Sequence, residues 1–200
     1  MTRLVILAKA PLAGFAKTRL IPALGAEGAA ALARSMLSHT LVQTLAAGMQ
    51  AVELCMSPAP SDPAWKDVAL PHAVELSEQG EGDLGVRMDR AIQRALARQQ
   101  GSVLLVGTDC PALSAAHIAE ANRQLEQHDA VLIPAADGGY VLIGLKAPGP
   151  SLFTGMAWST PVVAADTLHR MASLNLRVWQ GPLLHDIDEQ ADLEHLPASF

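Results

Sequence analysis

The chain has 200 residues and a formal net charge of −6; half of its residues are apolar and 17% are charged. This composition excludes wholesale disorder and suits one domain of ordinary size, which we expect over residues 1–200. The acidic balance argues against a nucleic-acid coat and against a polybasic membrane surface. No apolar stretch approaches the ~20 residues of a membrane helix.

The N-terminal apolar run is too short for the core of a signal peptide. The two cysteines indicate no disulfide framework, and reduced thiols are the rule in the cytoplasm. We therefore expect a soluble cytoplasmic protein with neither nucleic acid nor membrane as a partner. Whether it forms a homo-oligomer stays open.

Short apolar runs alternate with longer amphipathic stretches along the chain. Strands are expected over residues 3–8, 51–57, 72–79, 130–135, 140–145 and 177–181, and a further strand that ends in a polar turn is expected within 102–111. Helices are expected over residues 25–48, 86–100, 115–127, from Thr160–Pro161 onward and, as a short last helix, 188–196. Such alternation predicts a three-layer α/β domain with a mostly parallel sheet, in which ligands bind beyond the carboxyl ends of the strands.

A basic loop follows the first predicted strand. The stretch AKAPLAGFAKTRL gathers three cations and two turn-forming residues: Lys9, Lys17, Arg19, Pro11 and Gly14. Small residues let backbone amides approach an anion, lysine supplies a point charge, and arginine supplies a bidentate fork for phosphate oxygens. The stretch matches neither GxxxxGK[ST] nor GxGxxG. It indicates either a phosphate-binding loop of another kind or a surface loop with solvated cations.

Carboxylates follow two further apolar runs. Asp109 in GTDCP can bind a divalent cation or accept hydrogen bonds from the amides of its own turn. In DIDEQADL, Asp186 and Asp188 would face the same side of a strand, and with Asp109 they could hold one or two metal ions. Asp186 and Glu189 also have the spacing of a capping box. A Mg²⁺ or Mn²⁺ site and a purely structural role are both open.

Two glycine-containing stretches have two interpretations each. In ADGGY, Asp-Gly between apolar runs is a favoured tight turn, but Gly138 and Gly139 could also let a substrate approach the backbone beside Asp137. The stretch QGEGDLGVR is either an ordinary glycine loop before a helix or a site for a base or ribose. In the second case Gly80, Asp83 and Arg87 would contact the nucleotide, and Arg87 would face one of its phosphates.

Other catalytic chemistries are not indicated. The seven histidines are scattered, and neither HExxH nor CxxC occurs, so no zinc site is expected. No GxSxG marks a serine nucleophile. Cys110 is interpreted as a buried small residue because no partner base is indicated. Trp158 is a candidate substrate contact in a region that could form an acceptor lid or an interface.

Several ordered stretches resemble a known family: AKAPLAGFAKTRL, GDLGVRM, GTDCPAL, DGGYVLIGL, WSTPVV and DIDEQADL. They resemble the DUF2064 family, which is described as glycosyltransferase-like and as associated with radical-SAM proteins; some members are labelled arsenosugar-biosynthesis glycosyltransferases. The resemblance spans nearly the whole chain. It implies a GT-A fold, the α/β sandwich shared by sugar-nucleotide glycosyltransferases and nucleotidyltransferases. The nearest characterised relatives look like the molybdopterin and phospholactate guanylyltransferases.

The resemblance implies roles position by position. Lys9, Lys17 and Arg19 would contact the phosphates of a nucleotide. Asp109 looks like the metal-binding aspartate after the central strand, and Asp188 is the candidate for a second metal contact. Catalysis would rest on Lys17, Arg19 and Asp109. Two departures stand out: Thr108–Asp109–Cys110 replaces the usual Asp-x-Asp of GT-A glycosyltransferases, and Lys-Ala-Pro replaces the Gly-Gly loop of characterised nucleotidyltransferases.

The implied activity is transfer from a nucleotide-activated donor, foremost a sugar nucleotide, to a small-molecule acceptor, with Mg²⁺ or Mn²⁺. One alternative is a nucleotidyltransferase that uses an NTP and a phosphorylated acceptor and releases pyrophosphate. A second alternative is a nucleotide-binding protein without catalytic activity. The sequence names neither the base nor the sugar nor the acceptor.

Overall fold

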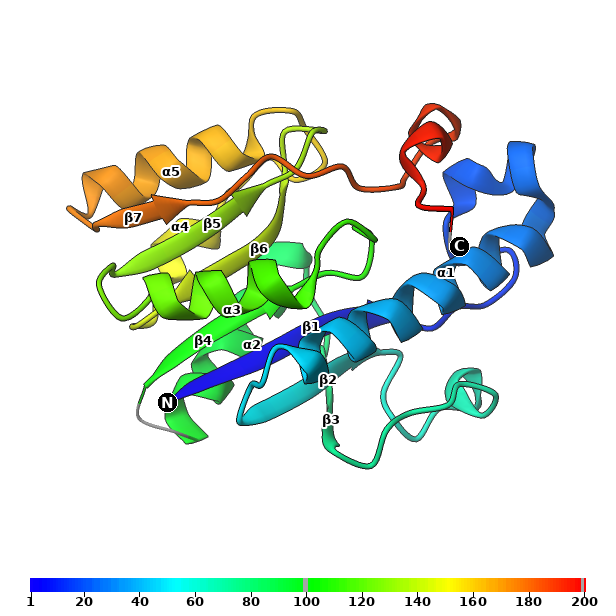
Figure 1. The fold of residues 1–200 in the computed structure, drawn as a ribbon, viewed down its shortest axis with the longest axis horizontal. Helices are drawn as coiled ribbons and strands as arrows, with labels where there is room; N and C mark the ends of the chain where they lie inside the picture. Colours follow the sequence, from blue (N-terminus) through cyan, green and yellow to red (C-terminus); the bar gives the residue numbers. More distant parts are fainter. Residues whose placement is uncertain (99–100, 199) are drawn as a thin grey trace.

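The computed structural model describes residues 1–98, 101–198 and 200, and its centre is one seven-stranded sheet (Figure 1). The strand order is β3-β2-β1-β4-β6-β5-β7. The strands are β1 (Thr2–Lys9), β2 (Ala51–Ser57), β3 (Val74–Glu78), β4 (Ser102–Val106), β5 (Ala130–Pro134), β6 (Tyr140–Leu145) and β7 (Val178–Gln180). Strand β6 pairs antiparallel with β4 and β5, and the other pairings between these strands are parallel. The mostly parallel sheet that the sequence predicts is thus confirmed.

Helices cover both faces of the sheet. The helices are α1 (Ile21–Ala46), α2 (Leu84–Arg98), α3 (Ala115–Gln124), α4 (Pro150–Phe153) and α5 (Val163–Ser173). Helices α1 and α3 pack on one face, and α2, α4 and α5 pack on the other. None of the helices in the described ranges is long and apolar enough to cross a bilayer. The three-layer arrangement is therefore also confirmed.

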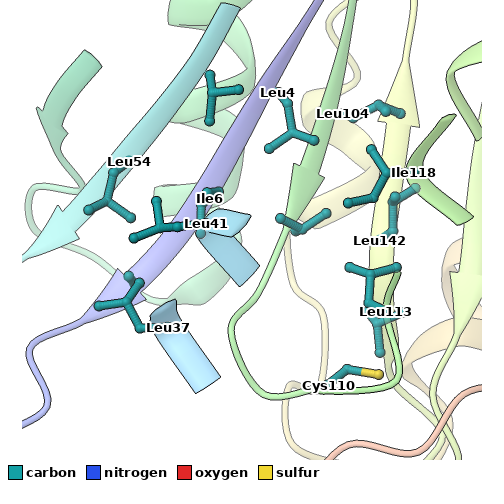
Figure 2. Close-up of a cluster of buried hydrophobic side chains, with 14 of the residues drawn as sticks. Leu4, Ile6, Leu37, Leu41, Leu54, Leu104, Cys110, Leu113, Ile118 and Leu142 are labelled. Carbon is teal, nitrogen blue, oxygen red and sulfur yellow. The ribbon is translucent and has the colours of Figure 1, made fainter. Parts of the chain in front are cut away.

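The first core layer joins the sheet to α1 and α3. Leu4 and Ile6 of β1 are fully buried and point to the face that these helices cover (Figure 2). Leu37 and Leu41 of α1 pack against them, while Val5 points to the opposite layer. A strand that is buried on both faces is apolar along its length. This burial explains the uninterrupted apolar run before the basic loop.

Several predicted boundaries differ from the structure. Gly25 has non-helical geometry (φ 71°, ψ 166°) and breaks α1 into a first turn from Ile21 and a long part that ends at Ala46; this long part corresponds to the predicted helix 25–48. The predicted helix 86–100 is observed as α2, although its last two residues lie outside the described ranges. The strand expected within 102–111 ends at Val106, before the polar turn, as predicted. The short helix α4 was not predicted.

Two predicted helix caps are wrong. The helix expected from Thr160 begins only at Val163, and the Thr160 hydroxyl donates instead to the carbonyl of Ala157 at 2.7 Å. The last helix is a 3₁₀ helix, η3 (Gln190–His195). Its capping box is formed by Glu189 and Asp192 rather than by Asp186 and Glu189. Asp186 is therefore free of the capping role that its spacing suggested.

Candidate functional site

A cleft lies beyond the carboxyl ends of β1 and β4, the edge at which open α/β sheets bind ligands. Its volume is about 510 Å³, which lies within the range of small-molecule sites. The basic loop, the loop after β4, the β5–β6 turn and the segment before η3 all contribute. The predicted site residues that line the cleft are Lys9, Lys17, Arg19, Asp109, Asp137, Gly139, Trp158 and Asp188.

Lys17 is the most enclosed charged group of this cleft. Its side chain is only 7% exposed, and it forms an ion pair with Asp109. Its ammonium donates hydrogen bonds at 2.7 Å to Oδ1 of Asp188 and at 2.7 Å to the carbonyl of Ile187. The backbone of Lys17 is left-handed (φ 47°), a conformation that non-glycine residues rarely adopt, where the basic loop enters the 3₁₀ helix η1 (Thr18–Leu20).

Two opposing effects set the charge of Lys17. Burial of the ammonium lowers the pKa of Lys17, whereas the negative charges of Asp109 and Asp188, and hydrogen bonds to both, raise it. The balance leaves the pKa above its ordinary value of 10.5. Lys17 is therefore a cation at neutral pH.

The chain holds the C-terminal segment against the loop after β4. The backbone N–H of Ile187 donates to the carbonyl of Asp109 at 2.8 Å. The Ile187 side chain is fully buried in a small cluster with Leu20 and Met36. On the next residue, the backbone N–H of Asp188 donates to the Asp192 carboxylate at 2.9 Å. These contacts place Asp188 opposite Asp109, although the two lie far apart in the sequence.

The oxygen atoms around the Lys17 ammonium are suitable ligands for a divalent cation. The described residues contain no group of three or more His, Cys, Asp or Glu side chains placed to hold a metal ion. Three oxygen atoms nevertheless converge on the Lys17 ammonium: one carboxylate oxygen of Asp109, one of Asp188 and the carbonyl oxygen of Ile187. The ammonium occupies the position that a metal ion would take between them. Hard oxygen donors of this kind suit Mg²⁺ or Mn²⁺. Asp109 and Asp188 are therefore compatible with the predicted metal-binding role.

Asp186 also lines the cleft, as does Asp137 of the β5–β6 turn. Burial, followed by repulsion from Asp137 and Asp188, raises the pKa of Asp186 to about 6. Its protonation therefore changes just below neutral pH. The sequence identifies Asp186 as a candidate carboxylate but does not reveal this burial.

The remaining predicted residues of the basic loop differ in their placement. Arg19 is well exposed and reaches Glu189 at 3.4 Å, so most of its guanidinium is open to a ligand. Lys9, at the end of β1, is exposed and lines the cleft. Pro11 is buried and Gly14 (φ 81°) turns the loop, and neither lines the cleft. These two residues shape the loop.

The stretch QGEGDLGVR contributes Gln79 and Leu84 to the cleft lining, whereas its predicted nucleotide contacts Gly80, Asp83 and Arg87 lie outside that lining. The Asp83 carboxylate accepts a hydrogen bond from the backbone N–H of Val86 at 2.9 Å, at the start of α2. The Arg87 side chain donates to the carbonyl of Gly82 at 2.8 Å. Gly80 (φ 69°) packs against Arg90. Each residue thus has a structural partner, and contact of Gly80, Asp83 and Arg87 with a nucleotide stays a prediction.

The expected space beside Gly138 is filled by protein. A Cβ atom at Gly138 (φ 90°) would lie 2.1 Å from the carbonyl oxygen of Pro161. Gly138 also accepts a hydrogen bond from the backbone N–H of Ala164 at 2.8 Å. The glycine therefore lets the segment before α5 pack on the β5–β6 turn. The prediction that Gly138 leaves room for a substrate is wrong. Gly139 does line the cleft.

The apolar part of the cleft was mostly missed by sequence reasoning. Met88 of α2 and Tyr140 of β6 line it, and the Tyr140 hydroxyl lies 3.8 Å from the Met88 sulfur. The indole N–H of Trp158 has no hydrogen-bond partner among the described residues. A Cβ at Gly85 would lie 3.0 Å from this nitrogen, so glycine lets Trp158 approach α2 closely. Only the glycine of GDLG hinted at such packing.

Two buried polar side chains complete the surroundings of the cleft. The Gln79 amide donates to the carbonyls of Ala8 and Cys55 at 2.9 and 3.0 Å, and Gln79 lines the cleft. The Cys110 thiol is buried and donates to the carbonyl of His185 at 3.2 Å. Burial raises the pKa of Cys110 to about 11, so the thiol stays protonated at neutral pH. This placement agrees with the structural role expected for Cys110.

Comparisons with known proteins agree with this architecture. The family model of DUF2064, described as an uncharacterized protein conserved in bacteria, matches residues 40–160. A crystal structure from Desulfovibrio desulfuricans G20 is 30% identical, with a TM-score of 0.90 over 99% of this chain and 87% of that chain. The name of that protein describes it, by inference, as a nucleotide-diphospho-sugar transferase. No curated protein matches the sequence.

More distant solved structures share the fold. Rv0371c from Mycobacterium tuberculosis H37Rv, in complex with manganese, is 16% identical; its TM-score is 0.58 over 100% of this chain and 99% of that chain. CMP:2-keto-3-deoxy-manno-octonic acid synthetase complexed with CTP is 11% identical, with a TM-score of 0.57 over 97% of this chain and 95% of that chain. The chain belongs to the DUF2064 family and has the fold of the nucleotide-diphospho-sugar transferases.

Proposed function

We propose that residues 1–200 act as one transferase domain that moves a group from a nucleotide-activated donor, foremost a sugar from a sugar nucleotide, to a small-molecule acceptor. The observation that carries this proposal is the Lys17 ammonium held between Asp109 and Asp188 in a cleft at the carboxyl ends of the strands. Lys9 and Arg19 add two more cations to the same cleft. A cleft in an acidic protein that gathers three cations suits the phosphates of a nucleotide.

The cations would act on the charge that develops during transfer. Release of a nucleoside diphosphate leaves negative charge on the leaving phosphate, and positive groups that are already in place stabilise it without reorganisation. Arg19 offers a bidentate fork for phosphate oxygens, and Lys9 and Lys17 offer point charges. A Mg²⁺ or Mn²⁺ ion held by Asp109 and Asp188 would add a Lewis acid beside those oxygens.

The position of Asp188 supports a metal-dependent transferase. The usual Asp-x-Asp of the fold is reduced to one carboxylate in Thr108–Asp109–Cys110. Asp188, brought in by the C-terminal segment, supplies a second carboxylate that converges on the same point. The manganese complex of Rv0371c, which shares the fold, lends further support.

We place the acceptor in the apolar part of the cleft. Tyr140 and Trp158 line this part, and Asp137 and Gly139 lie on the neighbouring turn. Aromatic faces suit a flat or ring-shaped acceptor, whereas the charged residues of the basic loop suit phosphates. Donor and acceptor would then meet near Asp109.

Nucleotidyl transfer is the second candidate because it needs the same neutralisation of phosphate charge. A synthetase with this fold is known in complex with CTP, which supports nucleotidyl transfer as a candidate. Product analysis separates the two reactions. Release of a nucleoside diphosphate from a sugar nucleotide supports glycosyl transfer, whereas release of pyrophosphate from an NTP with a phosphorylated acceptor supports nucleotidyl transfer. The variant Asp109→Asn serves as the control for contaminating activity. If a donor binds and neither product forms, the protein is a nucleotide-binding protein without catalytic activity.

A further inference from the structure

Lys17 takes up the cation position that the proposed function gives to a metal ion, and the inference drawn here rests on that proposal. An ammonium group has three N–H donors and no acceptor. In Lys17 these donors face Asp109, Asp188 and the carbonyl of Ile187. The ammonium thus has no donor left for a phosphate oxygen. Lys17 cannot bind a phosphate and keep these three contacts together.

The two carboxylates beside Lys17 also require a positive charge between them in the free protein. Its side chain is 7% exposed, so its charge is compensated by protein atoms more than by water. Asp109 and Asp188 would repel each other across the same gap if no cation lay between them. One cation is therefore needed at this point in the free protein, and Lys17 supplies it.

An ammonium and a divalent cation exclude each other at this position. Both would contact the same oxygens of Asp109 and Asp188, and two positive charges that close repel. The side chain of Lys17 ends a flexible four-carbon stem. Rotation about its side-chain bonds can therefore move the ammonium while the backbone of the basic loop stays in place.

We propose that Lys17 is a resident counter-ion that exchanges with the metal: it neutralises Asp109 and Asp188 in the free protein and turns to the donor phosphates when a divalent cation enters. Two consequences follow. The free protein binds divalent cations weakly, because Lys17 must first leave. Metal and nucleotide bind with positive coupling, because the phosphates give the displaced ammonium a new partner, and the coupling is the same in both directions.

The test measures Mn²⁺ binding without nucleotide. Free Mn²⁺ is counted by electron paramagnetic resonance during titration of the wild type, Lys17→Met and Lys9→Met. The two variants lose the same charge in the same cleft, but Lys9 is exposed at the end of β1. Because charge-assisted hydrogen bonds no longer have to be broken, Lys17→Met should bind Mn²⁺ at least about tenfold more tightly than the wild type. Lys9→Met should stay within about threefold of the wild type, as expected for an exposed and screened charge.

The outcomes separate this proposal from the function on which it rests. Tighter binding by Lys17→Met alone supports the exchange. Equally tight binding by Lys17→Met and the wild type overturns the exchange and leaves the metal site intact. If Lys17→Met binds no Mn²⁺, the metal site and the exchange are both overturned. Should Lys17→Met unfold, Lys17→Gln removes the charge but keeps a donor for one carboxylate, and the same three outcomes apply to it.

Discussion

The ammonium of Lys17 donates to Oδ1 of Asp188 at 2.7 Å, although the two residues lie 171 positions apart. One belongs to the loop after the first strand, and the other belongs to the C-terminal segment. The closeness of these two parts of the chain is visible in the fold, where the last segment runs back toward the start of α1 (Figure 1). The basic loop near the start of the chain and the segment before η3 therefore both line the cleft.

Asp109→Asn should abolish the metal dependence of nucleotide binding and leave the fold nearly unchanged. Asparagine has nearly the size of aspartate, its amide oxygen can still accept from Lys17, and Asp188 keeps one carboxylate beside the ammonium. An amide is a much weaker metal ligand than a carboxylate, because it carries no charge. Calorimetric titration with and without Mn²⁺ measures the effect. Asp62→Asn, an exposed carboxylate at the start of a 3₁₀ helix, is the control. Unchanged metal dependence in Asp109→Asn would sink the ligand assignment.

Arg19→Lys should weaken nucleotide binding by roughly tenfold, since it keeps the charge but loses one charge-assisted hydrogen bond of the bidentate fork. Thermal stability should hardly change, because the Arg19 side chain pairs with Glu189 at 3.4 Å and both side chains are exposed. Arg123→Lys, at an exposed arginine of α3, is the matched control. An affinity equal to that of the wild type would show that Arg19 is not a bidentate phosphate ligand.

Gly138→Ala should destabilise the protein by more than about 1 kcal/mol, because strained backbone and steric overlap add. The new Cβ would meet the carbonyl of Pro161, which would push the segment before α5 away from the cleft. Gly155→Ala has the same left-handed strain (φ 64°) but open space around the Cβ. Denaturant unfolding of both variants separates the two effects. Equal destabilisation would argue that the close approach to Pro161 has no energetic role.

Cys110→Ala should keep full activity and lose about 1 kcal/mol of stability, because a thiol hydrogen bond and a little packing are lost. Since burial raises the pKa of Cys110 to about 11, the thiol should also react slowly with iodoacetamide at pH 7.5 in the folded protein. Mass spectrometry of native and denatured samples measures the labelling. Loss of activity in a folded Cys110→Ala variant would point to a catalytic thiol.

Much of the fold could be predicted from the sequence because local patterns and the sheet agree. The strand over 51–57 is observed as predicted, since a short apolar run bounded by polar residues fits a central parallel strand. The candidates Lys17, Asp109 and Asp188 meet because the carboxyl ends of parallel strands share one edge.

The wrong predictions depend on distant contacts. Nothing near Gly138 in the sequence shows that Pro161 packs against it. In the C-terminal segment, two overlapping acid pairs compete for the capping role, and local spacing does not distinguish Asp186 with Glu189 from Glu189 with Asp192. The partners that make Lys17 a buried cation also lie far away in the sequence. Charge and burial of the site therefore became visible only with the structure.

Thermal unfolding against nucleotides and sugar nucleotides, with and without Mn²⁺, measures whether nucleotide binding at Lys17, Asp109 and Asp188 depends on the metal. A ligand at about a hundred times its dissociation constant should add roughly 2.7 kcal/mol of stability, which raises the unfolding midpoint by a few degrees. We expect such a shift with one base; it should be larger with Mn²⁺ in the wild type and the same with and without Mn²⁺ in Asp109→Asn. No shift with any nucleotide, or a shift that ignores the metal, would contradict this expectation.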